Sequence, residues 1–235
     1  VERFEKTICS YTYSNYSVLT NSATSALHIS CLALGLSEGD ILWTSPNSYV
    51  ASANVGLLCN AEVDFVDIDS DTYNMCPTAL SIKLKDAEKQ GKLPKIVMPV
   101  HFAGQSCDMI NIKKLSEKYG FKIIEDASHA IGGIYNNTKI GSCKFSDITV
   151  FSFHPVKIIT TAEGGCAITN DENIFEKLKL LRSHGVTRDP RNMVKKTLDK
   201  WAYDQISIGF NYRMSDMNAA LGLSQLSRID SFIDK

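Results

Sequence analysis

Residues 148–165, ITVFSFHPVKIITTAEGG, indicate most clearly how this chain folds. The β-branched and aromatic residues from Ile148 to Phe153 predict a buried strand. Pro155 breaks that strand, and Lys157 follows two residues later in a segment of small and turn-forming residues. Burial at such a position lowers the pKa of an ammonium group and leaves the neutral amine that Schiff-base chemistry needs. A lysine that only extends to solvent from a strand end is the competing interpretation.

A second strand end places acids near that lysine. The segment FKIIED, residues 121–126, predicts a strand that delivers Glu125 and Asp126 at its carboxyl end, with His129 shortly after. In open α/β sheets the ligand crevice lies outside the carboxyl ends of the strands, so we expect an acid and an amine in one crevice. This pairing suits pyridoxal phosphate (PLP), because a lysine holds its aldehyde carbon and a carboxylate keeps its pyridine nitrogen protonated.

Two longer stretches carry a family resemblance. IIEDASHAIGG (residues 123–133) and GSCKFSDITVFSFHPVKIITTAEGG (residues 141–165) resemble the DegT/DnrJ/EryC1/StrS family of sugar aminotransferases. The likeness extends over nearly all of the chain and implies an α/β fold, the large domain of a fold-type I PLP-dependent transferase. Strands alternating with helices independently favour a mainly parallel sheet with helices on both faces. Residues 1–235 are then expected to form this one domain, without the family's N-terminal segment or small C-terminal domain.

The resemblance also implies the catalytic residues. Lys157 matches the lysine that binds PLP covalently and then moves protons as general base and acid. Asp126 matches the partner of the pyridine nitrogen, and His129 lies where relatives place His or Gln beside the 3-oxygen of the ring. In relatives that dehydrate sugars, a histidine replaces the lysine, so Lys157 favours amine transfer.

Further positions match the family's cofactor contacts. Ala23 and Thr24 begin a predicted helix whose free backbone N–H groups would bind the PLP phosphate, although capping by Ser22 or Thr24 explains the same residues. The other matches are Tyr49 (stacking on the ring), Ser152 (donating to the phosphate) and Asn211 (reaching the phosphate of a neighbouring subunit). Without the resemblance, each of three residues has a structural interpretation. Tyr49 would be a core or interface residue, Asn211 would cap a turn, and His101 would be a hydrogen-bonded histidine of the core.

The implied reaction moves an amino group, from glutamate, to the 4-keto carbon of a UDP-linked 2-acetamido-2,6-dideoxy-hexos-4-ulose on the route to pseudaminic acid. The implied assembly is a homodimer with shared active sites. Two alternatives stay open: a truncated, non-catalytic PLP-binding or dimerisation module, and a family member that acts on a different nucleotide keto-sugar.

Composition excludes several other classes. The chain has 235 residues, 44% hydrophobic and 22% charged, and a formal net charge of −1. We expect no nucleic-acid partner, since no basic cluster is present, and no membrane partner, since no apolar run approaches a membrane span. Seven scattered cysteines without CxxC spacing favour reduced thiols in a cytoplasmic protein over a disulfide framework or a metal site. Motifs of the HExxH and GxGxxG type are missing, which argues against a zinc hydrolase and a Rossmann dehydrogenase.

Two expectations concern the end of the chain. Asp189 to Lys200 is polar, charged and contains a proline, which predicts a mobile loop. Ser215 is expected to cap a helix of about fifteen residues.

Overall fold

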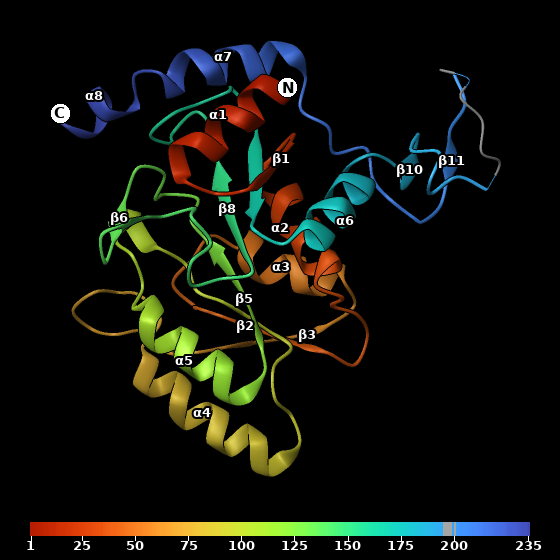
Figure 1. Ribbon diagram of the computed structural model, residues 1–235. Coiled ribbons are helices and arrows are strands. Elements are labelled where there is room, and N and C mark those ends of the chain that lie inside the picture. Colours follow the sequence, from red (N-terminus) through yellow and green to blue (C-terminus); the bar gives the residue numbers. More distant parts are fainter. Residues whose placement is uncertain (195–198, 200) are drawn as a thin grey trace.

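The computed structural model describes residues 1–194, 199 and 201–235. The predicted mobile loop Asp189–Lys200 therefore falls in part outside the described residues. A seven-stranded sheet forms the centre of the molecule, in the order β1-β9-β8-β5-β4-β2-β3 (Figure 1). Its strands are β1 (Tyr16–Thr20), β2 (Ile41–Thr44), β3 (Glu62–Phe65), β4 (Ile96–Met98), β5 (Lys122–Asp126), β8 (Ile148–Ser152) and β9 (Gly165–Thr169).

The sheet is mainly parallel, as predicted. Strands β8, β5, β4, β2 and β3 pair in parallel, whereas β9 is antiparallel to both of its neighbours, β8 and β1. Parallel neighbours need long crossover connections, but an antiparallel pair can be joined by a short one. The strand before Lys157 and the strand after it are such an antiparallel pair, in which Ser152 lies opposite Gly165.

Helices cover both faces of the sheet, which confirms the predicted layers. Packed on one face, with Val150 and Ile124 in the same core, are α2 (Ala23–Ala33), α3 (Ala51–Leu58) and α6 (Glu172–Arg182). The helices of the other face are α1 (Glu2–Thr12), α4 (Pro77–Gln90), α5 (Met109–Tyr119) and α7 (Asp216–Leu226). Because successive side chains of a strand point to opposite faces, Val150 packs under α2 whereas Phe151 packs under α1.

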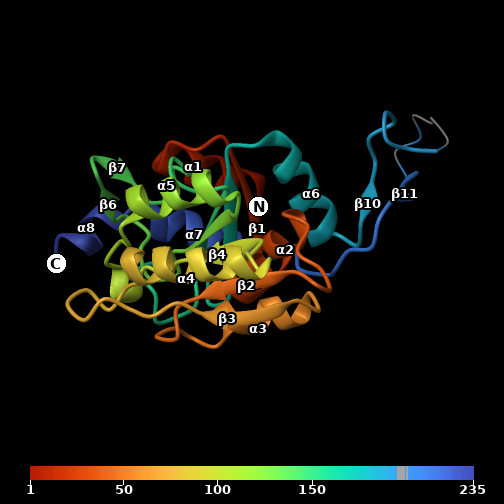
Figure 2. The same cartoon turned by 90° about the horizontal axis from the view of Figure 1, so that it is seen from below.

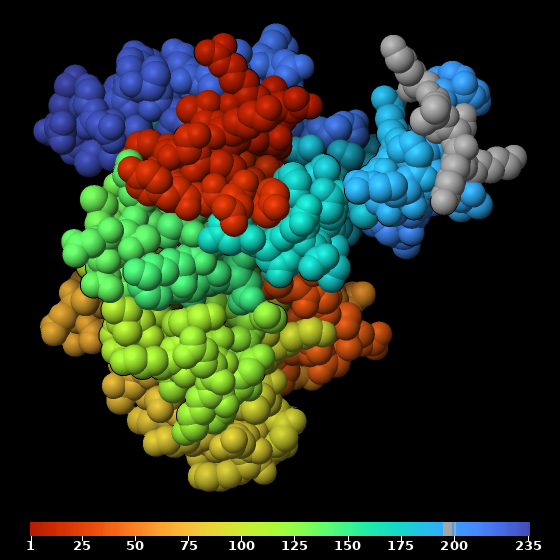
Figure 3. Space-filling model, in the orientation of Figure 1, coloured from red at the N-terminus to blue at the C-terminus, as the bar shows by residue number. Residues whose placement is uncertain are grey.

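Two small hairpins lie outside the main sheet. One is formed by β6 (Ile134–Tyr135) and β7 (Thr138–Lys139), the other by β10 (Val186–Thr187) and β11 (Asp204–Gln205). The β10–β11 hairpin extends away from the layered body (Figures 2 and 3).

The expected fifteen-residue helix after Ser215 is divided in two. Ser215 is its N-cap, as predicted, and accepts a 3.2 Å hydrogen bond from the Asn218 N–H. Helix α7 nevertheless ends at Leu226 after 11 residues, and α8 (Ile229–Ile233) follows. Arg228 separates the two because its backbone, at φ −117°, is not helical. No helix in the described part of the chain is long and apolar enough to cross a membrane; the cytoplasmic location stays a prediction.

Candidate active site

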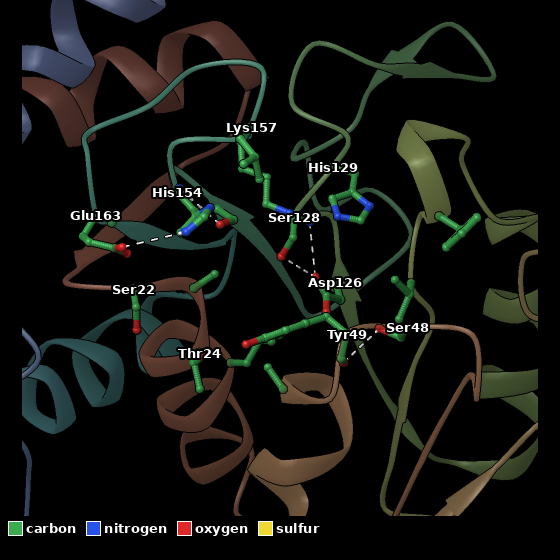
Figure 4. Close-up of a pocket in the computed structure, with 18 residues that line it drawn as sticks. Ser22, Thr24, Ser48, Tyr49, Asp126, Ser128, His129, His154, Lys157 and Glu163 are labelled. Carbon is green, nitrogen blue, oxygen red and sulfur yellow. Dashed lines mark hydrogen bonds and ion pairs between the residues drawn. The ribbon is translucent and has the colours of Figure 1, made fainter.

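A cavity of about 380 Å³ lies at the carboxyl ends of β5 and β8 and is bordered by the first turns of α2 and α3 (Figure 4). This is where an open α/β sheet is expected to bind its ligand. Seven of the eight residues predicted from the sequence line it together: Lys157, Asp126, His129, Tyr49, Ala23, Thr24 and Ser152.

Asp126 presents a buried carboxylate to the cavity. Ser52 donates a 2.7 Å hydrogen bond to its Oδ2, and the Ser128 hydroxyl and N–H donate to its Oδ1 at 2.6 and 3.2 Å. All three donors are neutral, and within the described ranges no ion pair includes Asp126. A buried carboxylate is stabilised further by a cationic partner, so this side of the cavity suits a positively charged ligand group.

Lys157 lies on the loop between β8 and β9 and extends its side chain toward Ser128 and Asp126 (Figure 4). Its backbone N–H donates to the His154 carbonyl at 2.9 Å, which fixes the base of the side chain. The Nζ atom has no hydrogen-bond or ion-pair partner among the described residues. Partial burial lowers the pKa of Lys157, and the charge of Asp126 opposes that effect only in part. The site thus holds an amine that loses its proton more readily than an ordinary lysine.

His129 lies beside Lys157 in the same cavity (Figure 4). Burial and the nearby charge of Lys157 lower the pKa of His129, and Asp126 raises it by less. The imidazole is therefore neutral at pH 7 and can donate or accept one hydrogen bond toward a ligand.

The first turn of α2 shows the predicted capping, and phosphate binding at this turn stays a prediction. Ser22 is the N-cap and accepts from the Ser25 N–H at 3.1 Å. The N–H groups of Ala23 and Thr24 find no acceptor in the described chain and lie at the edge of the cavity. A Cβ atom on Gly165 would lie 2.5 Å from the Ala23 nitrogen, so only glycine permits this approach of β9 to the helix.

Tyr49 and Ser152 border the cavity at different depths. Tyr49 is 75% exposed and makes no ring contact with other described residues, so its face is free to cover a ligand. Ser152 is buried at the end of β8, and its hydroxyl accepts a 3.4 Å hydrogen bond from the His154 N–H. The hydroxyl proton of Ser152 is thereby left for a ligand.

Two residues that the sequence analysis named lie outside the cavity of the single chain. Glu125 does not face the cavity: it points to the opposite face of the sheet, because consecutive strand residues alternate. Asn211 does not line the cavity either; it is exposed and forms an isolated bridge with Ser183. Its predicted role across a subunit interface is a separate matter that one chain does not test.

The sequence analysis did not predict three residues that line the cavity, Ser128, His154 and Glu163, or Ser52, which binds Asp126 without lining the cavity. Ser128 follows Asp126 by two residues, the spacing at which a side chain closes a local turn, and this spacing was the available signal. Ser52 comes from α3, and no local pattern pairs it with Asp126. His154 and Glu163 flank the loop of Lys157, with Nε2 and Oε1 3.9 Å apart.

The fold is that of a fold-type I PLP-dependent transferase. The model of the DegT/DnrJ/EryC1/StrS aminotransferase family matches residues 1–235, and the chain belongs to that family. A UDP-4-amino-4,6-dideoxy-N-acetyl-beta-L-altrosamine transaminase from Campylobacter jejuni is 42% identical over 236 residues, which cover 100% of this chain and 58% of the relative.

Solved structures agree with this assignment. Helicobacter pylori PseC, an aminotransferase involved in the biosynthesis of pseudoaminic acid, has a TM-score of 0.85 at 34% identity, over 98% of this chain and 58% of that one. The PLP form of Spr1654 from Streptococcus pneumoniae has a TM-score of 0.83 at 29% identity, over 98% and 59% of the two chains. The chain thus spans less than two thirds of the length of these relatives.

Proposed function

We propose that this chain is the PLP-binding domain of a sugar-nucleotide aminotransferase. The observation that carries the proposal is that Lys157 and the buried carboxylate of Asp126 share one cavity. Within the described part of the chain, the amine of Lys157 has no hydrogen-bond or ion-pair partner. The proposed reaction moves an amino group, from glutamate, to the 4-keto carbon of a UDP-linked 2-acetamido-2,6-dideoxy-hexos-4-ulose. The Campylobacter relative, whose name describes a transaminase of a UDP-linked amino sugar, supports this substrate class.

The residues present fit PLP at three points. The free N–H groups of Ala23 and Thr24 and the Ser152 hydroxyl suit a phosphate, because a helix N-terminus is a ready anion site. Asp126 suits a protonated ring nitrogen, since its other donors are neutral. The exposed ring of Tyr49 suits stacking over an aromatic plane.

Each side chain then has a chemical task. When bound, PLP supplies an electron sink that allows an amino group to leave an amino acid and join a keto-sugar. Lys157 Nζ would hold the cofactor and, once neutral, would take up and return protons at the reacting carbon. Asp126 would keep a proton on the ring nitrogen, and neutral His129 would orient the ring through one hydrogen bond.

We further propose a homodimer with shared active sites. Glutamate carries two carboxylates, yet no arginine among the described residues lines the cavity. Asn211 is exposed and outside the cavity of its own chain, where it is free to reach the site of a second copy. Both observations favour a site that a partner subunit completes.

An absorption titration with PLP, followed by borohydride reduction and peptide mapping, tests the proposal. We expect PLP to be fixed on Lys157 in the wild-type chain, and none to be fixed in Lys157→Ala. Lys139→Ala is the matched control, since Lys139 lies over Tyr11 away from the cavity.

A coupled assay with the UDP-linked keto-sugar and glutamate tests the reaction itself. Amine transfer that depends on Lys157 supports the aminotransferase. Fixation of PLP without turnover would instead support a PLP-binding module, and PLP fixed equally well in Lys157→Ala would refute the assignment of the site.

A further inference from the structure

A second buried carboxylate lies directly behind the cavity. Glu125, on the face of the sheet opposite Asp126, is 4% exposed. Its Oε2 contacts His101 Nε2 at 2.7 Å, and its Oε1 accepts hydrogen bonds from Ser146 and Thr149 at 2.5 and 3.2 Å. Burial alone would raise the pKa of Glu125, but these hydrogen bonds outweigh it and hold the pKa below its usual value. The carboxylate is therefore ionised and fully bonded.

His101 connects this carboxylate to the backbone of Asp126. Its ring donates from Nε2 to Glu125 and accepts at Nδ1 from the Cys107 N–H at 3.1 Å, so both nitrogens are held. Its own backbone N–H donates to the Asp126 carbonyl at 3.0 Å. The Asp126 N–H in turn donates to the Pro99 carbonyl at 2.9 Å.

These bonds close a ring around one peptide. The path runs from the Glu125 carboxylate through the His101 imidazole to the His101 N–H, and then to the carbonyl of Asp126. Beyond Met98 the ladder between β4 and β5 continues only as an isolated bridge, Val100 with Asp126, since the strand itself ends there. The regular ladder with β8 holds the Asp126 backbone on one side, whereas on the other side the backbone contacts come from residues 99–101, which lie beyond the end of β4.

We propose that His101 and Glu125 are positioning residues that hold the Asp126 carboxylate in the cavity from the opposite face of the sheet. This inference rests on the proposed function for its meaning in catalysis, but the structural link can be tested without PLP. Asp126 raises the pKa of Lys157, so the Lys157 amine reports whether the carboxylate is in place.

The test is a double-mutant cycle on the PLP-free chain, read out by the pH dependence of acetic anhydride labelling at Lys157. Asp126→Asn should lower the pKa of Lys157, because it removes a favourable charge. His101→Asn, whose amide is too short to reach Glu125, should lower it in the same direction. In the Asp126→Asn background the His101 substitution should have no further effect, since non-additivity marks residues that act through one another.

Two variants separate positioning from general loss of stability. His101→Gln places an amide near the position of Nε2 and should recover most of the Lys157 pKa. Asp147→Asn removes a carboxylate that holds the other end of β5 through Lys122 and the Ile123 N–H, and should leave that pKa unchanged. Thermal unfolding of each variant shows that it is folded.

A second measurement applies the same cycle to PLP affinity. In the wild-type background, His101→Asn should raise the Kd for PLP about tenfold, which lies within the range of coupling between contacting residues. In the Asp126→Asn background, the same substitution should raise the Kd by less than about twofold. An unchanged Lys157 pKa in folded His101→Asn, or equal shifts in both backgrounds, would overturn the inference. A wild-type chain that binds no PLP would instead contradict the proposed function, while the labelling cycle would still decide the role of His101.

Discussion

The hydroxyl of Ser52 donates a 2.7 Å hydrogen bond to Asp126 Oδ2 across 74 positions of sequence. This bond ties the first turn of α3 to the end of β5. Hydrogen bonds to charged groups contribute about 1.5–3 kcal/mol. Ser52→Ala should therefore lower the free energy of unfolding in urea by about 1–3 kcal/mol and weaken PLP binding. Ser10→Ala, which removes an exposed hydroxyl bonded within α1, should change it by less than about 0.5 kcal/mol; equal effects would contradict the role of Ser52.

The titration of Lys157 gives a second prediction. Partial burial lowers its pKa in the folded state, so the unfolded chain binds the proton more tightly. This shift lowers the free energy of unfolding at pH values below the folded pKa of Lys157. The loss disappears as the pH rises to the ordinary lysine value of about 10.4. Competitive labelling should show a midpoint for Lys157 below that value, whereas Lys89, whose pKa Asp86 raises, should titrate above it. The reverse order would show that the amine is not desolvated.

The third prediction is that Gly165→Ala weakens the binding of phosphate. In Gly165→Ala the new Cβ would meet the Ala23 nitrogen and the Ser22 carbonyl at 2.5 Å, so the N-terminus of α2 must move. We expect a free energy of unfolding lower by about 1–3 kcal/mol and a Kd for inorganic phosphate and PLP raised at least tenfold. Gly91→Ala is the control, because it strains a helix end at φ 64° away from the cavity. It should destabilise the fold and leave both affinities intact.

Ala162 offers a stabilising substitution next to the site. Its φ of 65° lies in the left-handed region, which costs a residue with a Cβ roughly 1–2 kcal/mol. Ala162→Gly should raise the free energy of unfolding by about 0.5–1 kcal/mol, after the greater entropy of the unfolded glycine chain is subtracted. Ala53→Gly, within α3, should lower it by about 1 kcal/mol. A lower stability for Ala162→Gly would refute the strain at this position.

The strand ends could be predicted because their signal is local. Buried strands that end at Asp126 and shortly before Lys157 predict that both side chains lie at the same edge of the sheet, and in the structure both line one cavity. The start of α2 was likewise visible in Ser22 and the small residues that follow. Family resemblance added Tyr49 and Ser152, which no local pattern distinguishes from core or interface residues.

The remainder depends on tertiary contacts that no single stretch contains. Glu125 and Asp126 are adjacent in sequence, and only the register of β5 decides which of the two enters the cavity. Ser52 contacts Asp126 and His101 contacts Glu125, and these partners lie 74 and 24 positions apart in the sequence. Asn211 is matched by motif alone, and its predicted role at the phosphate of a neighbouring subunit stays a prediction.

The reversed direction of β9 has a consequence for how such enzymes can diversify. Ser152 and Gly165 face each other across the ladder, and the Phe153 N–H donates to the Gly164 carbonyl at 2.9 Å. The segment 153–164, which contains Lys157, therefore begins and ends at neighbouring positions of the paired strands β8 and β9. Because the two ends of this segment lie side by side, related proteins can differ in its length and sequence without a shift of the surrounding strands.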